Sequence, residues 1–432
     1  MTHYPETSVF FRKLQWEYPR ITHGAGSWVY DDAGAAYLDA CGGAFVSNLG
    51  HGVAEIADAM AAQAKKLAYV SGMTLTHTAV EEFADELAKL APGDLNKVYP
   101  LSSGSDAVEA ALKLARQYWA ELGQPSKKNI VALSPSYHGN TLLALSASAR
   151  EHYKRTYEGW LVDVVHVAGY DAEALSHAIE RAGPDTVAAF IMEPVGGSST
   201  GARVPPAGYL RRVREICDRH KVLFIADEIL CGAGRTGTWS ALEPEGVVPD
   251  IQVLGKGIAG GFAPLAAVIA PSRVADVFAQ GSGGLNHAQT FSHHAVSCAA
   301  GTATLRYIAR HKLVDRCAAM GRKLHAKLAD LRGLPNVGTI RGRGLLAGVE
   351  LVEDATTHAP LPRSLHFAET LTRAALDAKL IVWPNVGHAN GTDGDLVMLA
   401  PPFIVTEDEI DIMVQRLGDA IQTTTKTLAV RT

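Results

Sequence analysis

The stretch Val253–Ala270, VLGKGIAGGFAPLAAVIA, sets one lysine and a glycine-rich turn between two apolar runs. Short runs of this kind, rich in Val and Ile and bounded by turn residues, are typical of buried strands. Longer amphipathic stretches separate such runs along the chain, which predicts α/β layers around a mostly parallel central sheet. Sheets of this type bind ligands at the carboxyl ends of their strands. The candidate strands are Ile130–Leu133, Ala188–Met192, Val222–Ala226, Ile251–Leu254 and Ala266–Ala270.

Three parts are expected along the chain. Residues 1–67 form an N-terminal segment that contributes to a small lobe, and alternating aromatic and apolar residues predict a hairpin over Ser27–Leu38. Residues 68–319 form the large domain that contains the candidate strands. Residues 320–432 form a smaller α+β domain at the C-terminus. Its expected elements are a helix over Met320–Leu331, a turn and strand in RGRGLLAGVEL, a helix near Phe367–Ala378 and a final helix from Glu407.

The composition is that of an ordinary globular protein, with 432 residues, 47% hydrophobic residues and a formal charge of −5. Basic residues are scattered, so no nucleic-acid partner is expected. The N-terminus lacks the apolar run of a secretory signal, and the uncharged stretch Gly257–Ser272 is shorter than the roughly 18 residues of a membrane helix. Five widely spaced cysteines form no metal or disulfide pattern. These features favour a cytoplasmic protein without a metal site.

Two charged residues follow candidate strands and suit the chemistry of one ligand. Lys256 lies between Gly255 and Gly257, where an apolar setting would lower the pKa of its amine. A lower pKa favours the neutral amine, which is the form that bonds to a carbonyl carbon. Asp227 ends the run VLFIA, where a buried carboxylate could keep a pyridine nitrogen protonated. Taken singly, a solvated loop lysine and a turn-capping aspartate are the ordinary interpretations.

A third element is the start of a helix in SSGSDAVEAALKLAR. Asp106 and Glu109 form a D-x-x-E start, so we expect the helix to begin near Asp106. Gly104 and Ser105 lie at that end, where free backbone N–H groups and the helix dipole attract a phosphate. A helix that is merely well capped is the alternative.

Together these elements resemble the class III aminotransferases, the ω-aminotransferase branch of the fold-type I pyridoxal-phosphate enzymes. The resemblance covers most of the chain. It includes SNLGHGVAEIADAMAAQ, SGSDAVEAALKLAR, SYHGNT, IMEPVGG, ADEILCGAGRTG, LGKGIAGGFAPLAA, AQTFSHHAVSCAAGTATL and LAPPFIVTEDEID, in the order of the family. It implies an aminotransferase with pyridoxal 5'-phosphate as cofactor, bound to Lys256 as a Schiff base and to Asp227 through the ring nitrogen.

The same resemblance implies further cofactor-binding residues. Tyr137 would stack on the pyridine ring, and Glu193 would lie behind the site near Asp227. Thr290 in AQTFS would reach the phosphate of the neighbouring subunit, so the active unit would be a homodimer, or a tetramer built from dimers. The complete cofactor-binding set is Ser103, Gly104, Ser105, Tyr137, His138, Glu193, Asp227, Lys256 and Thr290.

Some of these motifs also fit other kinds of protein. The segment 232–237 satisfies G-x-G-x-x-G after a strand, as in nicotinamide-dependent oxidoreductases, but Pro244 and Pro249 follow where a long helix should begin. His287, His293 and His294 lack the spacing of a metal site. Aminomutases, racemases and decarboxylases share the family's motifs and stay open as alternatives.

Substrate choice rests on two departures from the family. Relatives that use 2-oxoglutarate with ornithine or 4-aminobutyrate carry a glutamate five residues after the glutamate of the E-P motif, which is Glu193 here. This chain has Ser198 at that position, so we expect pyruvate as the keto acid. The stretch Trp383–Pro402 lacks the arginine that pyruvate-using relatives place before L-A-P-P. His388 could replace it weakly, and Arg150 could enter from elsewhere. Without either, the preferred donor would be an amine whose carboxylate is remote or absent.

Overall fold

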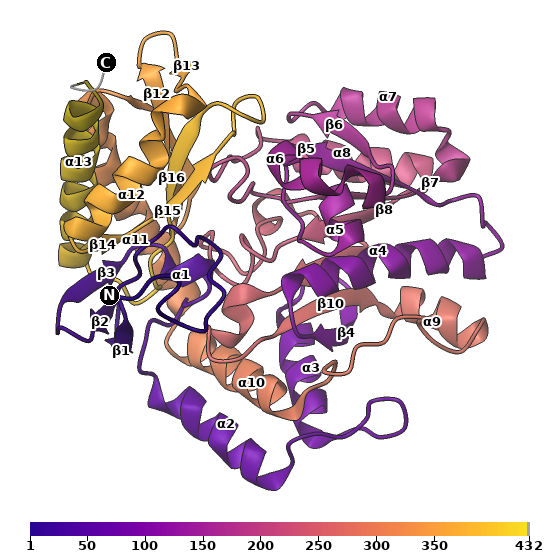
Figure 1. The fold of residues 1–432 in the computed structure, drawn as a ribbon. Coiled ribbons are helices and arrows are strands. Elements are labelled where there is room, and N and C mark those ends of the chain that lie inside the picture. The colour runs from indigo at the N-terminus through magenta and orange to yellow at the C-terminus, as the bar shows by residue number, and fades with distance from the viewer. Residues whose placement is uncertain (430–432) are drawn as a thin grey trace.

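The computed structural model describes residues 1–429. Figure 1 shows two halves, one built on a large central sheet between helices and the other built from the N-terminal segment and the C-terminal part of the chain. The last three residues of the expected 320–432 domain lie outside the described residues. The three domain boundaries, like the cytoplasmic location, stay predictions.

The large sheet has seven strands in the order β4-β10-β9-β8-β7-β5-β6. Neighbouring strands are parallel except that β10 runs antiparallel to both β9 and β4. All five predicted strands are present within one residue at each end, and β4 and β6 were not predicted. The strands are β4 (Leu95–Leu101), β5 (Asn129–Ser134), β6 (Val165–Ala168), β7 (Val187–Met192), β8 (Leu223–Asp227), β9 (Ile251–Leu254) and β10 (Ala266–Pro271).

Helices cover both faces of this sheet, as the apolar faces of its strands require. The buried face of α4 (Gly104–Glu121) packs on one side in a single apolar cluster with residues of β5, β7, β8, β9 and β10. On the other side, α7 (Ala172–Ala182) and α8 (Tyr209–His220) pack against alternate residues of β5, β7 and β8. Residues 187–192 of β7 are therefore all buried.

The second half contains two smaller sheets. The first has the order β1-β2-β3-β14, with β14 (Leu380–Ile381) parallel to β3, so both ends of the chain contribute to it. The second has the order β11-β12-β16-β15, with β13 beside β12. The predicted hairpin is confirmed by β2 and β3. The remaining strands are β1 (Ile21–Ala25), β2 (Trp28–Asp31), β3 (Ala36–Asp39), β11 (Val337–Arg343), β12 (Leu346–Asp354), β13 (Ala359–Pro360), β15 (Trp383–Val386) and β16 (Asp395–Leu399).

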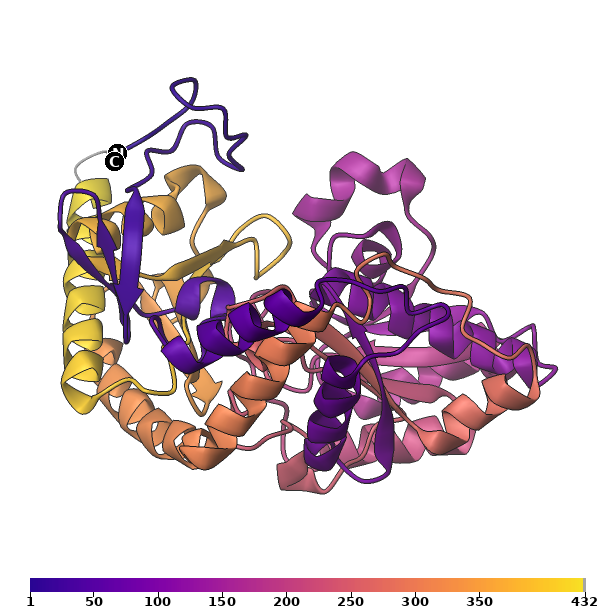
Figure 2. The ribbon, with the colours of Figure 1, turned by 90° about the horizontal axis from the view of Figure 1, so that it is seen from below.

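The predicted C-terminal helices are present, but α11 begins at Leu313, seven residues before the predicted Met320. The helix α10 contributes buried residues to the cores of both halves and crosses between them in Figure 2. Among residues 1–429, no helix is both long and apolar enough to cross a bilayer. The other helices are α1 (Gly42–Phe45), α2 (Ala54–Lys66), α3 (Thr78–Leu90), α5 (Leu142–Ala147), α6 (Glu151–Lys154), α9 (Ser272–Gln280), α10 (Ala295–Arg310), α11 (Leu313–Leu328), α12 (Phe367–Asp377) and α13 (Glu407–Ala429).

Candidate active site

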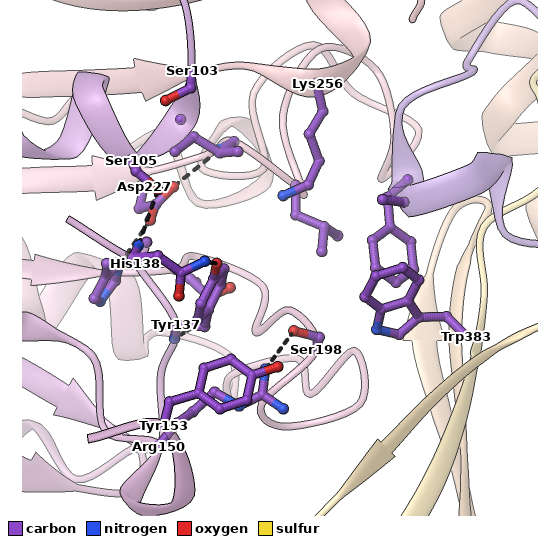
Figure 3. Close-up of a pocket in the computed structure, with 18 of the residues that line it drawn as sticks. Ser103, Ser105, Tyr137, His138, Arg150, Tyr153, Ser198, Asp227, Lys256 and Trp383 are labelled. Carbon is purple, nitrogen blue, oxygen red and sulfur yellow. Dashed lines mark hydrogen bonds and ion pairs between the residues drawn. The ribbon is translucent and has the colours of Figure 1, made fainter. Parts of the chain in front are cut away.

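A cavity of about 250 Å³ lies beyond the carboxyl ends of the parallel strands, between the two halves (Figure 3). Its wall brings together side chains that are far apart in the sequence. Eight of the nine predicted cofactor-binding residues line it: Ser103, Gly104, Ser105, Tyr137, His138, Glu193, Asp227 and Lys256. Thr290 does not line this cavity and lies exposed in the segment before α10.

Asp227 is the last residue of β8, and its carboxylate is fixed by two contacts. His138 Nδ1 lies 2.7 Å from Asp227 Oδ2, and the N–H of Ile229 donates to Oδ1 over 3.1 Å. Both side chains of the pair are buried. His138 Nε2 is buried and has no hydrogen-bond partner among residues 1–429. The histidine thus orients the carboxylate against the cavity.

Glu193 follows β7 and lines the same cavity as Asp227, near enough for the charge of Asp227 to act on its carboxyl. Its two oxygens accept the backbone N–H groups of Tyr137 at 3.1 Å and Gly197 at 3.0 Å. Burial raises the pKa of this carboxyl to about 7, and the negative charge of Asp227 acts in the same direction. Glu193 therefore titrates near neutral pH and ties two loops together at the floor of the site.

Lys256 follows β9 with φ 46°, in the left-handed region that few non-glycine residues adopt. Burial lowers the pKa of its amine, although the charges of Asp227 and Glu193 act against this. Within the part of the chain that the structure describes, no hydrogen bond or ion pair holds Nζ, and the side chain points into the cavity in Figure 3. At Gly257, an added Cβ would lie 1.8 Å from Asn48 Nδ2, so the backbone after the lysine requires glycine.

The helix α4 begins at Gly104, two residues before the predicted start. Ser103 is its N-cap residue, because its Oγ accepts the N–H of Asp106 at 3.3 Å. Asp106 is thus the N3 residue of the helix, and its carboxylate accepts the Ser103 hydroxyl over 2.6 Å. The D-x-x-E interpretation was wrong, because serine caps a helix as well as aspartate does and stands three residues earlier.

The first turn of α4 has backbone N–H groups without partners inside the helix, and it opens on the cavity. The SYHG loop packs against it, since Ser105 Oγ accepts the N–H of Asn140 at 3.0 Å. Gly139 has φ 143°, and a Cβ there would lie 2.7 Å from Ser105 Oγ. The close approach of loop and helix forms a concave, N–H-rich surface that fits a phosphate group.

Comparison with known proteins identifies the family. The sequence matches the aminotransferase class-III family over residues 15–421. The chain belongs to the class III aminotransferases. An uncharacterized aminotransferase of Schizosaccharomyces pombe is 36% identical in an alignment of 430 positions, which covers 95% of this aminotransferase and 94% of that protein.

Solved structures confirm that this aminotransferase has the predicted fold-type I architecture. A transaminase from the marine bacterium Virgibacillus superposes with a TM-score of 0.90 at 32% identity, covering 95% of this chain and 94% of that one. The Pseudomonas jessenii ω-transaminase, solved in complex with PMP, has a TM-score of 0.87 at 32% identity, covering 95% and 94%.

The nicotinamide alternative is excluded for this aminotransferase by the structure after β8. Residues 229–240 form turns and bends instead of a helix, so no helix N-terminus follows the G-x-G-x-x-G segment. Arg235 in that segment is buried and donates to the carbonyl oxygens of Leu345 at 2.9 Å and Pro401 at 2.6 Å. The glycines thus serve a compact structural turn.

Several cavity residues of the aminotransferase were not predicted, or were left unplaced. Phe45 of α1 and Trp383 of β15 contact each other with ring centroids 5.2 Å apart and form the wall contributed by the second half (Figure 3). Trp383 belongs to the stretch without arginine, so that stretch does border the cavity. His388 of the same stretch does not, because Glu350 holds its Nε2 at 2.9 Å. Arg150 lines the cavity.

Proposed function

We propose that this aminotransferase uses pyridoxal 5'-phosphate to move an amino group from a primary amine or ω-amino acid to a keto acid in a ping-pong reaction. The proposal rests on one observation: Lys256, Asp227 and the start of α4 face a single cavity. These are the amine, the carboxylate and the phosphate site that the cofactor requires. When bound, the cofactor supplies an electron sink through its protonated pyridine ring.

Each of these groups has a distinct part in holding the cofactor. Lys256 Nζ would form the covalent link, and this assignment is supported because no hydrogen bond or ion pair within residues 1–429 holds the amine. Asp227, oriented by His138, would hold the protonated ring nitrogen. The N–H groups of Gly104 and Ser105 would hold the phosphate, and Tyr137 would lie against the ring. The PMP bound to the P. jessenii ω-transaminase supports the choice of cofactor.

Lys256 also serves as the proton carrier. With a donor amine in its place on the cofactor, Nζ would be a free base in a buried setting, where its lowered pKa favours the neutral amine that accepts a proton. The same Nζ would return that proton to the carbon on the other side of the substrate nitrogen, two bonds away, so a single side chain would move the proton in each half-reaction.

The keto acid in this proposal is pyruvate. Ser198 lines the cavity where relatives that use 2-oxoglutarate carry a glutamate. A clear rate advantage of 2-oxoglutarate over pyruvate, in single-turnover reactions of the aminated enzyme, would refute this choice. A racemase, aminomutase or decarboxylase would instead turn over an amino acid without any keto acid being present.

Substitution of Lys256 tests the core of the proposal. Wild-type protein should bind the cofactor with visible absorption and transaminate, whereas Lys256→Ala should lose turnover and the covalently linked spectrum. Lys128→Ala removes an exposed lysine and is the matched control. A fully active Lys256→Ala protein would end the proposal.

The shared site of a homodimer, inferred from Thr290, is the second part of the proposal. Thr290 is exposed in the single chain, which suits contact with a neighbouring subunit. Mixing Lys256→Ala with Thr290→Ala protein under conditions of subunit exchange should restore activity, because hybrid dimers assemble one wild-type site. Exchanged mixtures that stay inactive would argue that each chain completes its own site.

A further inference from the structure

Arg150 is a buried cation in the cavity wall without an acidic partner. It lies between α5 and α6 and is 9% exposed. Its Nη1 donates to Ser198 Oγ at 3.4 Å, and its Nη2 donates to Asn385 Oδ1. Among residues 1–429, no carboxylate lies within ion-pair distance of the guanidinium. Every hydrogen-bond partner that the structure gives Arg150 is neutral.

Aromatic rings hold the guanidinium in place. Its central carbon lies 4.4 Å from the ring centre of Tyr153 and 5.6 Å from that of Tyr137. Arg12 lies on the same Tyr153, with Nη2 donating to the tyrosine hydroxyl at 2.7 Å. Figure 3 shows Arg150 and Tyr153 beside Tyr137 and Ser198, on the side of the cavity that Lys256 faces. This part of the wall therefore carries two guanidinium groups, and the charge of Glu193 in the same cavity acts on Arg150 without forming an ion pair with it.

A buried guanidinium with only neutral partners is costly, because burial removes its hydration without supplying a counter-charge. Burial accordingly lowers the pKa of Arg150. Two half-buried arginines are paired with acids: Arg214 with Asp250 at 2.8 Å, and Arg341 with Glu350 at 3.2 Å. The buried Arg235 instead donates to carbonyl oxygens inside the protein and does not line the cavity. Arg150 differs from them because it borders a cavity that a charged ligand can enter.

We propose that Arg150 binds the substrate carboxylate, so that the substrates of both half-reactions are amino acids and keto acids. The inference rests on the proposed transaminase function and names its substrate class. A planar guanidinium with five N–H donors can bind a carboxylate through two parallel hydrogen bonds in a bidentate arrangement. Ser198 leaves that contact open, since a serine contributes no competing negative charge.

The proposal also explains the stretch Trp383–Pro402. That stretch supplies no arginine, but its Asn385 accepts a hydrogen bond from the arginine that the other half supplies. The two halves thus build one carboxylate site together. The sequence predicted a donor without a nearby carboxylate for the case in which no arginine lines the site. Because Arg150 lines it, we expect a donor that carries a carboxylate.

The test compares matched substrates that differ only in the charged group. β-Alanine is paired with propylamine, and L-alanine with isopropylamine, where a methyl group replaces the carboxylate. The rate of each single-turnover reaction with the cofactor-loaded enzyme is followed by visible absorption. In Arg150→Gln, we expect kcat/KM for β-alanine and L-alanine to fall by roughly 10- to 150-fold, mainly because KM rises. The values for propylamine and isopropylamine should change by less than about threefold.

Two further variants separate charge recognition from structure. Arg155→Gln removes an exposed arginine from the adjoining η1 helix (Arg155–Trp160) and should change none of the rates. Arg150→Lys keeps the charge without the planar fork and should give an intermediate loss with the amino acids. If kcat/KM fell equally for the two amino acids and the two carboxylate-free amines in either Arg150 variant, Arg150 would only hold the cavity wall together. That result would overturn the proposal.

A binding measurement covers the case in which no transamination occurs. Propionate is titrated into the cofactor-loaded protein by calorimetry, and its affinity should be at least tenfold weaker for Arg150→Gln than for wild type. A protein that binds propionate through Arg150 but transfers no amino group would refute the proposed function alone. A protein that transaminates but binds propionate equally with and without Arg150 would refute this inference alone.

Discussion

The carboxyl of Glu193 should make the stability of this protein depend on pH in the neutral range. Burial raises its pKa in the folded protein to about 7 from the ordinary 4.5. Between these two values, the folded protein keeps a proton that the unfolded chain has released. The free energy of unfolding therefore decreases as the pH rises through this window, and the full loss is present above pH 7.

The size of this effect follows from the shift in pKa. A difference of about 2.5 units corresponds to about 3 kcal/mol. Glu193→Gln removes the titration, because an amide resembles the neutral acid at every pH. Glutamine has only one accepting oxygen, so one of the N–H groups of Tyr137 and Gly197 loses its acceptor, which costs about 1 to 3 kcal/mol at all pH values. The two effects separate because only the first depends on pH.

The assay is urea unfolding of the cofactor-free protein at fixed chain concentration, from pH 4.5 to 8. The free energy of unfolding of the wild type, minus that of Glu193→Gln, should fall by about 3 kcal/mol across this range. Glu158→Gln serves as the control for the loss of an exposed carboxylate. A difference that stays constant with pH would show that Glu193 is ionised throughout and would refute the reasoning.

Three further substitutions test how the site is built. Gly139→Ala should weaken cofactor binding at least tenfold in a spectral titration, because its Cβ would strike Ser105 Oγ; unchanged affinity would show that the loop yields freely. Ser103→Ala should lower the free energy of unfolding by about 0.5 to 2 kcal/mol through loss of the helix cap, and an unchanged urea midpoint would contradict that role. Lys127→Met should cost about 3 kcal/mol or more, measured by the same unfolding, because the ammonium donates to three carbonyl oxygens in buried or part-buried hydrogen bonds; a neutral result would mean that these oxygens find other donors.

The sequence predicted the centre of the fold because local pattern and tertiary environment agree there. The strands β7, β8 and β9 are buried on both faces, so each is a continuous apolar run that pattern alone identifies. Asp227 and Lys256 follow such runs, and the parallel direction of the strands brings them to one edge. The edge strand β6 is only four residues long and partly exposed, so it left no comparable signal.

Other features depend on contacts that no local pattern contains. Lys127 is 1% exposed, and a lysine gains such a position only from carbonyl groups more than fifty residues away. Phe45 and Trp383 meet only when the two halves pack together. The position of Arg150 follows from the turn after α5, and nothing in the sequence around it separates a cavity arginine from a surface one.

The pairing of β14 with β3 joins residues that the ribosome adds very far apart in time. Leu380 lies opposite Leu38, and Lys379 donates to the hydroxyl of Tyr37, 342 residues earlier. At roughly 5 to 20 residues per second, the N-terminal hairpin waits for tens of seconds with one strand edge unpaired. The central sheet needs no residue beyond Pro271 and can form during that interval. A nascent chain halted before Leu380 therefore exposes a sheet edge that chaperones or other chains can bind.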